Sequence, residues 1–183
     1  MLGKKDVKIY MAGKTWSAHW YREMVKRGFI STARWINEEN VLKDATDIMP
    51  DSVHQNEGYK RDIWAKCKTD CFAADMGIIA AHPDDGNMHS GSLVELGHIT
   101  ALDRPVYILG TCASFEPAGD SDRAWKSQPC VYYWPEYDVT NADALEIGML
   151  RAVRHYIENY TDQWFQNNPF SSQMWRLPEN VST

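Results

Sequence analysis

One acidic residue, Glu95, stands in a short motif whose chemistry could cleave a bond to a sugar. The motif is the run 91–97, GSLVELG, which follows the apolar stretch 76–81 and a polar loop. An ionised carboxylate can attack an anomeric carbon and form a covalent glycosyl-enzyme, as in retaining glycosidases. Gly91 and Gly97 would let a substrate or neighbouring backbone come close, because glycine has no side chain. The run therefore makes Glu95 a candidate nucleophile.

The same run also fits the start of a helix. Ser92 and Glu95 have the spacing of a capping box, in which a serine at the N-cap and a glutamate three residues later satisfy free backbone N–H groups. Capping boxes are common, so local sequence alone favours this structural explanation. The two roles are compatible, because the helix dipole would keep a carboxylate in the first turn ionised.

A second candidate site lies in the loop before this run. The segment His82-Pro83-Asp84-Asp85 is similar to the motif of zinc-dependent sugar N-deacetylases, in which the histidine and one aspartate bind zinc and the other aspartate acts as a base. Here the motif follows the third predicted strand rather than the first, and His98 and His155 lie in predicted helices. Pro83 and the residues after it also favour a plain turn.

These residues need a scaffold, and the apolar pattern predicts alternating strands and helices. Apolar runs predict strands over residues 7–12, 29–36, 76–81, 105–109 and 130–134. Helical spacing predicts helices over 16–26 and 59–73, from Ser92 onward, and from about 141 to 160. The alternation predicts an α/β domain over residues 1–160, with a parallel five-stranded sheet between two layers of helices.

In such sheets, ligands bind outside the carboxyl ends of the strands. The segments 12–15, 82–91 and 110–111 follow three predicted strands, so we expect the chemistry among them. Residues 38–58 and 110–129 are predicted to be mainly loop. The segment 161–183 carries scattered aromatic residues, and we expect it to pack on the domain or against a partner subunit.

Composition excludes several classes of function. The chain of 183 residues is 44% hydrophobic, which suits one packed domain. A net charge of −6 argues against binding nucleic-acid polymers, whose phosphates require clustered cations. The start has no signal-peptide core, and no apolar run approaches membrane-spanning length. Four cysteines without metal-finger spacing favour a reduced, cytoplasmic setting.

In order and spacing, residues 7–135 resemble the nucleoside 2-deoxyribosyltransferase family, including its nucleotide N-glycosidase relatives. The matching pieces are the segments 8–13 (KIYMAG), 74–75 (AD), 91–97 and 101–106 (ALDRPV). The resemblance implies a flavodoxin-like domain that cleaves an N-glycosidic bond, with Glu95 as the nucleophile and Tyr10 beside it. It also implies a nucleoside or nucleotide substrate, no cofactor, and a homo-oligomer in which a neighbouring subunit completes the pocket.

The resemblance is less direct at the residues that would handle the base and the sugar. The family's acidic residue on the helix before the third strand is nearest to Asp70 here, although the family spacing falls on Cys67. Where transferases carry an aspartate that holds the sugar, this chain has His89. Hydroxyls and a helix start suit a 5'-phosphate, so His89, Ser90 and Ser92 are expected to bind one together with Lys14. The predicted substrate-binding residues are Gly13, Lys14, Asp85, His89, Ser90, Gly91 and Ser92.

Three classes of function therefore remain open. The first is an enzyme that transfers or hydrolyses a glycosyl group through Glu95, with transfer to a base or to water undecided. The second is a zinc deacetylase that uses His82 and Asp85. The third is a nucleotide-binding module without catalysis, in which Glu95 only caps its helix.

Overall fold

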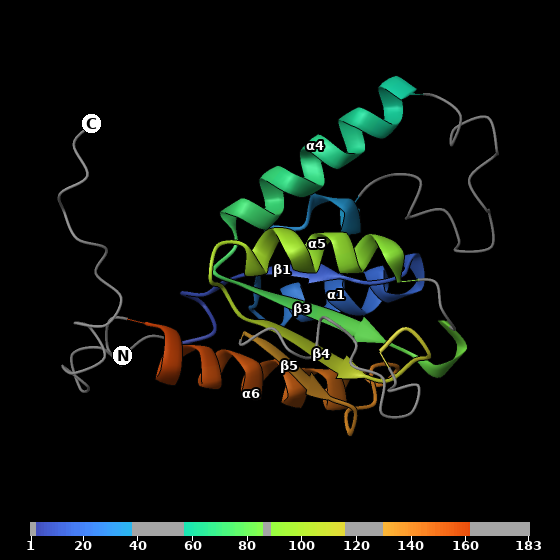
Figure 1. Ribbon diagram of the computed structural model, residues 1–183. Coiled ribbons are helices and arrows are strands. Elements are labelled where there is room, and N and C mark those ends of the chain that lie inside the picture. Colours follow the sequence, from blue (N-terminus) through green and yellow to red (C-terminus); the bar gives the residue numbers. More distant parts are fainter. Residues whose placement is uncertain (1–2, 38–56, 86–88, 116–129, 162–183) are drawn as a thin grey trace, which may run out of the picture.

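Five parallel strands form one sheet in the order β2-β1-β3-β4-β5 (Figure 1). The computed structural model describes residues 3–37, 57–85, 89–115 and 130–161. The strands are β1 (Lys8–Ala12), β2 (Ile30–Ser31), β3 (Met76–Ala81), β4 (Val106–Gly110) and β5 (Val131–Trp134). The helices are α1 (Ala18–Lys26), α4 (Glu57–Ala73), α5 (Ser90–Thr100) and α6 (Ala142–Tyr160). This strand order is the flavodoxin-like one, so the predicted fold class is confirmed.

Helices cover both faces of the sheet. Helices α4 and α5 pack together on one face, and α1 and α6 pack together on the other (Figure 1). The central strand β3, with the sequence MGIIAA, is buried along its whole length. Continuous apolar runs of this kind are typical of parallel strands that are covered on both faces.

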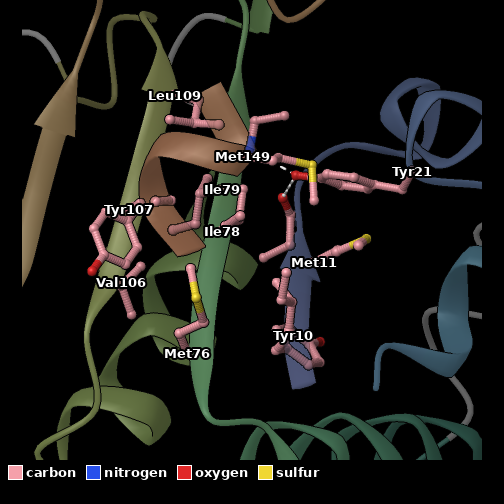
Figure 2. Close-up of a cluster of buried hydrophobic side chains, with 14 of the residues drawn as sticks. Tyr10, Met11, Tyr21, Met76, Ile78, Ile79, Val106, Tyr107, Leu109 and Met149 are labelled. Atoms are coloured by element: carbon pink, nitrogen blue, oxygen red, sulfur yellow. Dashed lines mark hydrogen bonds between the residues drawn. The ribbon is translucent and has the colours of Figure 1, made fainter. Parts of the chain in front are cut away.

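The core lies between these layers and β1, β3 and β4. Figure 2 shows side chains of the three strands packed together, with Met149 entering from α6 and Tyr21 from α1. Tyr10, Tyr21 and Tyr107 are each fully buried. A buried tyrosine hydroxyl needs a hydrogen-bond partner, and two of these hydroxyls bear directly on the candidate site.

The strand predicted over 29–36 is wrong beyond its first residues. Strand β2 spans only Ile30–Ser31, and a 3-10 turn follows at Arg34–Asn37. The buried residues Phe29, Ala33 and Ile36 recur every three or four positions, which fits a turn better than an extended strand. The backbone N–H of Arg34 donates to Asp70 instead of to a neighbouring strand, so pairing stops there.

Helix α5 begins earlier than predicted. It spans Ser90–Thr100 with His89 as its N-cap, and the Leu93 N–H donates to the His89 carbonyl at 2.9 Å. Ser92 is therefore inside the first turn and Glu95 is in the second. The predicted capping box is wrong, because Ser92 does not occupy the N-cap.

The other predicted helices are present with small differences. In α4, Cys67 and Cys71 are buried as expected, but Trp64 is 42% exposed. Helix α6 begins after Asn141, whose side chain accepts the N–H groups of Asp143 and Ala144. In the part of the chain that the structure describes, no helix combines the length and apolar character that crossing a membrane requires. Most of the predicted loops at 38–58 and 110–129, and nearly all of the tail 161–183, lie outside the described residues.

Candidate active site

The side chains of Tyr10 and Glu95 meet under helix α5. The Tyr10 hydroxyl, from β1, donates a hydrogen bond of 2.6 Å to Oε1 of Glu95. Glu95 is only 9% exposed and Tyr10 is not exposed at all. Tyr10 faces α5 because alternate side chains of β1 point to opposite faces of the sheet. The predicted proximity of Tyr10 to Glu95 is therefore present in the structure.

Burial has the largest effect on the pKa of Glu95. Removal from water raises its pKa from 4.5 to about 7, although the Tyr10 hydroxyl and the Cys67 thiol both act to lower it. We expected the start of the helix to keep this carboxylate ionised. Glu95 instead lies in the second turn, beyond the strongest part of the dipole, and desolvation has the larger effect.

Cys67 is a member of this site that residue-type reasoning did not select. It lies on α4, and its side chain interacts with both Glu95 and Tyr10. Burial and the nearby Glu95 raise the pKa of the Cys67 thiol to about 11, so it is a neutral hydrogen-bond donor near pH 7. Cys67 occupies the position at which the family spacing expects an acidic residue. That spacing was the signal that could have identified Cys67.

Asp70 is engaged elsewhere. Its Oδ1 accepts the Arg34 Nε–H at 2.7 Å, and its Oδ2 accepts the Arg34 backbone N–H at 3.0 Å. Asp70 is 6% exposed, and the two hydrogen bonds fix it against the turn after β2. Its carboxylate thus joins α4 to that turn, whereas the next helical turn toward the N-terminus of α4 brings Cys67 to Glu95.

A second polar group follows the end of β3. Asp85, at 5% exposure, accepts the Trp16 Nε1–H at 2.6 Å on Oδ1 and the His82 N–H at 2.9 Å on Oδ2. The same Oδ2 lies 2.9 Å from Nε2 of His89, whose Nδ1 lies 3.2 Å from Oγ of Ser92. Burial alone would raise the pKa of Asp85, but the hydrogen bonds from His89, His82 and Trp16 hold it below its usual value.

This arrangement corrects the predicted phosphate pocket. The His89 side chain has no exposed surface, and both of its ring nitrogens face protein partners. His89 and Ser92 therefore form part of a buried chain of hydrogen bonds instead of an open loop around an anion. The side chain of Ser90 lies outside the described part of the structure.

Two hollows of about 430 Å³ each open at the carboxyl edge of the sheet. One is lined by Lys14, Trp16, His82 and Asp85, and the other by His82, Thr111 and Tyr137 among others. They lie where the fold predicts ligands, and His82 lines both. The structure therefore brings Lys14 and Asp85 together, but Glu95 and Tyr10 line neither of these two hollows.

The glycines near these hollows differ in what they permit. A Cβ at Gly13 would lie 2.6 Å from the Ser17 hydroxyl oxygen, so no larger residue fits there without movement. Among the residues that the structure describes, a Cβ at Gly91 or Gly97 would meet nothing within 4 Å. Space beside Gly91 is thus open, as close approach of a substrate would require.

The hydroxyl of Tyr21 fixes the point where β1 and β3 separate. It donates to the Ala12 carbonyl at 2.6 Å and accepts the Ala80 N–H at 2.8 Å (Figure 2). Strand order reverses between these two strands, so this is the switch point at which ligands of such sheets bind. Tyr21 thereby satisfies buried backbone groups that neither strand satisfies for the other.

The His82 motif forms a 3-10 turn, as its proline and aspartates predict. The turn spans Pro83–Asp85, and the Asp84 N–H donates to Nδ1 of His82 at 3.2 Å. Among the residues that the structure describes, no cluster of three or more histidine, cysteine or acidic side chains is arranged to hold a metal ion. Both Asp85 oxygens are already engaged by protein donors.

Comparisons with known proteins add no assignment. No protein-family model matches the chain. No curated protein matches it either.

Proposed function

We propose that this protein cleaves the N-glycosidic bond of a nucleoside or nucleoside 5'-monophosphate. Glu95 would attack C1' of the sugar, release the base and carry the sugar as a covalent ester. A second base or water would then attack C1' from the opposite side, with overall retention of configuration. The proposal requires no cofactor.

One observation carries this proposal, namely the 2.6 Å hydrogen bond from Tyr10 to a buried Glu95. A nucleophilic carboxylate reacts best when it is poorly hydrated, oriented and still ionised in a useful fraction. A pKa of about 7 leaves roughly half of Glu95 ionised at neutral pH. The Tyr10 hydroxyl orients the carboxylate and stabilises its charge without providing a cation that would quench its reactivity.

The departing base needs a proton as the C1'–N bond breaks. Cys67 is the neutral donor beside Glu95, whereas Asp70, the acidic residue that the family resemblance implies, is held by Arg34 one turn further along α4. A 5'-phosphate would find the positive charge of Lys14 in the hollow beyond β1. We further propose a cytoplasmic homo-oligomer; four buried free cysteines support a reducing compartment.

The test is an assay of base release by the full-length protein treated with a metal chelator. A panel of nucleosides and their 5'-monophosphates is incubated with and without a second free base, and the bases are followed by chromatography. We expect release of free base or formation of a new nucleoside, and a sugar adduct on the Glu95 peptide by mass spectrometry. Glu95→Gln should abolish both, whereas Glu158→Gln, which changes an exposed glutamate on α6, should leave them intact.

Three outcomes would overturn the proposal. Turnover that survives Glu95→Gln would remove Glu95 from the chemistry. Turnover that requires added zinc would favour a deacetylase centred on His82. Binding of a nucleotide without any base release would favour a module without catalysis.

A further inference from the structure

Asp85, His89 and Ser92 form a directional chain of hydrogen bonds. An ionised Asp85 can only accept, so the ring proton of His89 must lie on Nε2, which faces Asp85 at 2.9 Å. In the neutral ring this leaves the lone pair of Nδ1 facing Oγ of Ser92 at 3.2 Å. The order of aspartate, histidine and serine is that of the serine-hydrolase relay, with the two ring nitrogens exchanged.

The chain is firmly held in this orientation. Asp85 is fixed by Trp16 and by the His82 backbone, so its carboxylate cannot turn away from His89. The His89 ring packs against Phe115, with 5.1 Å between ring centroids, and its backbone N–H donates to Ser114. A histidine that only capped a helix would not need an aspartate fixed by two further donors.

The chain ends beside the proposed nucleophile. Ser92 and Glu95 are three residues apart on α5, and both are buried. Side chains with this spacing are neighbours on one helix face, with about 5–6 Å between their Cβ atoms. The sugar carried by Glu95 would lie against this face of α5, with the Ser92 hydroxyl beside it, and the attacking water would stand on the side of C1' opposite the ester bond.

We propose that Asp85, His89 and Ser92 are the general-base relay that activates water in the second half of the reaction, which makes the protein a hydrolase. This inference rests on the proposed function of Glu95. Water attacks C1', the bond between C1' and the Glu95 oxygen breaks, and Glu95 leaves as a carboxylate. The water proton passes to Oγ of Ser92, the Ser92 proton passes to Nδ1 of His89, and Asp85 stabilises the imidazolium. Ser92 contacts the attacking water directly. His89 and Asp85 act through the Ser92 hydroxyl, as positioning residues.

The test separates the two halves of the reaction. The protein is mixed with a panel of 2'-deoxynucleoside 5'-monophosphates, and three quantities are measured: base release in the first turnover, the steady-state rate, and the fraction of protein carrying a sugar by intact mass. For Ser92→Ala and His89→Gln we expect an unchanged first turnover, a steady-state rate lower by about 10²-fold, and accumulation of the sugar adduct. Ser92→Thr keeps a hydroxyl and should restore most of the rate.

Thr100→Ala is the matched control, because it removes a hydroxyl of the same helix α5 that donates to the Leu96 carbonyl and has no part in the relay. We expect it to behave as the native protein. Equal loss of the first-turnover and steady-state rates in Ser92→Ala, or unchanged rates in both, would overturn the relay while leaving Glu95 as the nucleophile. If the native protein releases no base at all, the proposed function fails and the relay fails with it. If His89→Gln does not fold, as judged by near-UV circular dichroism, the comparison of Ser92→Ala with Ser92→Thr decides.

Discussion

The Tyr10 hydroxyl on β1 and the Glu95 carboxylate on α5 lie 2.6 Å apart, although 85 positions separate them in the chain. Neither residue is within reach of the other until α5 has packed on the sheet. Folding brings Glu95 into this contact and out of water, so the pKa of Glu95 differs between the folded and the unfolded protein. The first two predictions follow from this difference.

Glu95→Gln should stabilise the protein at alkaline pH. Between about pH 4.5 and 7 the folded protein keeps a proton on Glu95 that the unfolded chain releases, so the free energy of unfolding falls as pH rises through this interval. A glutamine has no such penalty and can still accept from Tyr10. Urea unfolding should show a gain of about 3 kcal/mol over the native protein at pH 8 and almost none at pH 4. An equal difference at both pH values would contradict the assigned pKa.

Tyr10→Phe should shift the pH dependence of base release upward. The reaction needs the ionised form of Glu95, so the first-turnover rate should rise tenfold per pH unit below about 7 and level off above it. Loss of a hydrogen bond to a carboxylate is worth about 1.5–3 kcal/mol, which moves the midpoint up by about 1–2 pH units. The control Tyr160→Phe removes a hydroxyl that contacts only Tyr132 among the described hydrogen bonds, and should leave the midpoint in place.

Tyr21→Phe should destabilise the protein by about 3 kcal/mol. The substitution leaves the Ala12 carbonyl and the Ala80 N–H buried without their partner. Urea unfolding would measure the loss. Tyr137→Phe, which removes an exposed hydrogen bond from Arg151, should cost less than about 0.5 kcal/mol. Similar losses for the two variants would mean that water replaces the Tyr21 hydroxyl.

Two glycine substitutions should have opposite effects. Gly110 has a φ of 77°, and a Cβ there would overlap the Ala81 carbonyl oxygen. Gly110→Ala should therefore cost more than about 2 kcal/mol, through backbone strain and displacement of the end of β3. A Cβ at Gly97, within α5, would meet none of the described part of the chain within 4 Å, so Gly97→Ala should stabilise by about 0.5–1 kcal/mol. Thermal unfolding of both variants checks the pair.

The sequence alone was sufficient for the fold class because the strands of a parallel sheet are continuous apolar runs. Residues 76–81 and 105–109 are such runs, so they are interpreted as strands. Their alternation with helices indicates a sheet with a layer of helices on each face. The segment 29–36 resembles a strand in sequence because it is rich in apolar residues. The three- and four-residue spacing of Phe29, Ala33 and Ile36 fits the observed turn, in which Asp70 accepts the Arg34 N–H.

The contact between Tyr10 and Glu95 was predictable, but the pKa of Glu95 was not. The proximity of Tyr10 and Glu95 followed from the resemblance, but the pKa of Glu95 depends on how deeply α4 and α5 bury it, which no local pattern encodes. The relay was missed for a different reason. Because α5 starts at Ser90 and not at Ser92, His89 is its N-cap and lies three residues before Ser92 at the same helix start, where the two side chains meet.

The closeness in sequence of Asp85, His89 and Ser92 has a consequence for the order of assembly. Their contacts span one turn and the start of one helix, so they can form early, while the rest of the chain is still searching for its strand partners. The contact of Glu95 with Tyr10 is long-range and must wait until β1 has joined the sheet. We therefore expect a folding chain to form the contacts between Asp85, His89 and Ser92 before Glu95 reaches Tyr10.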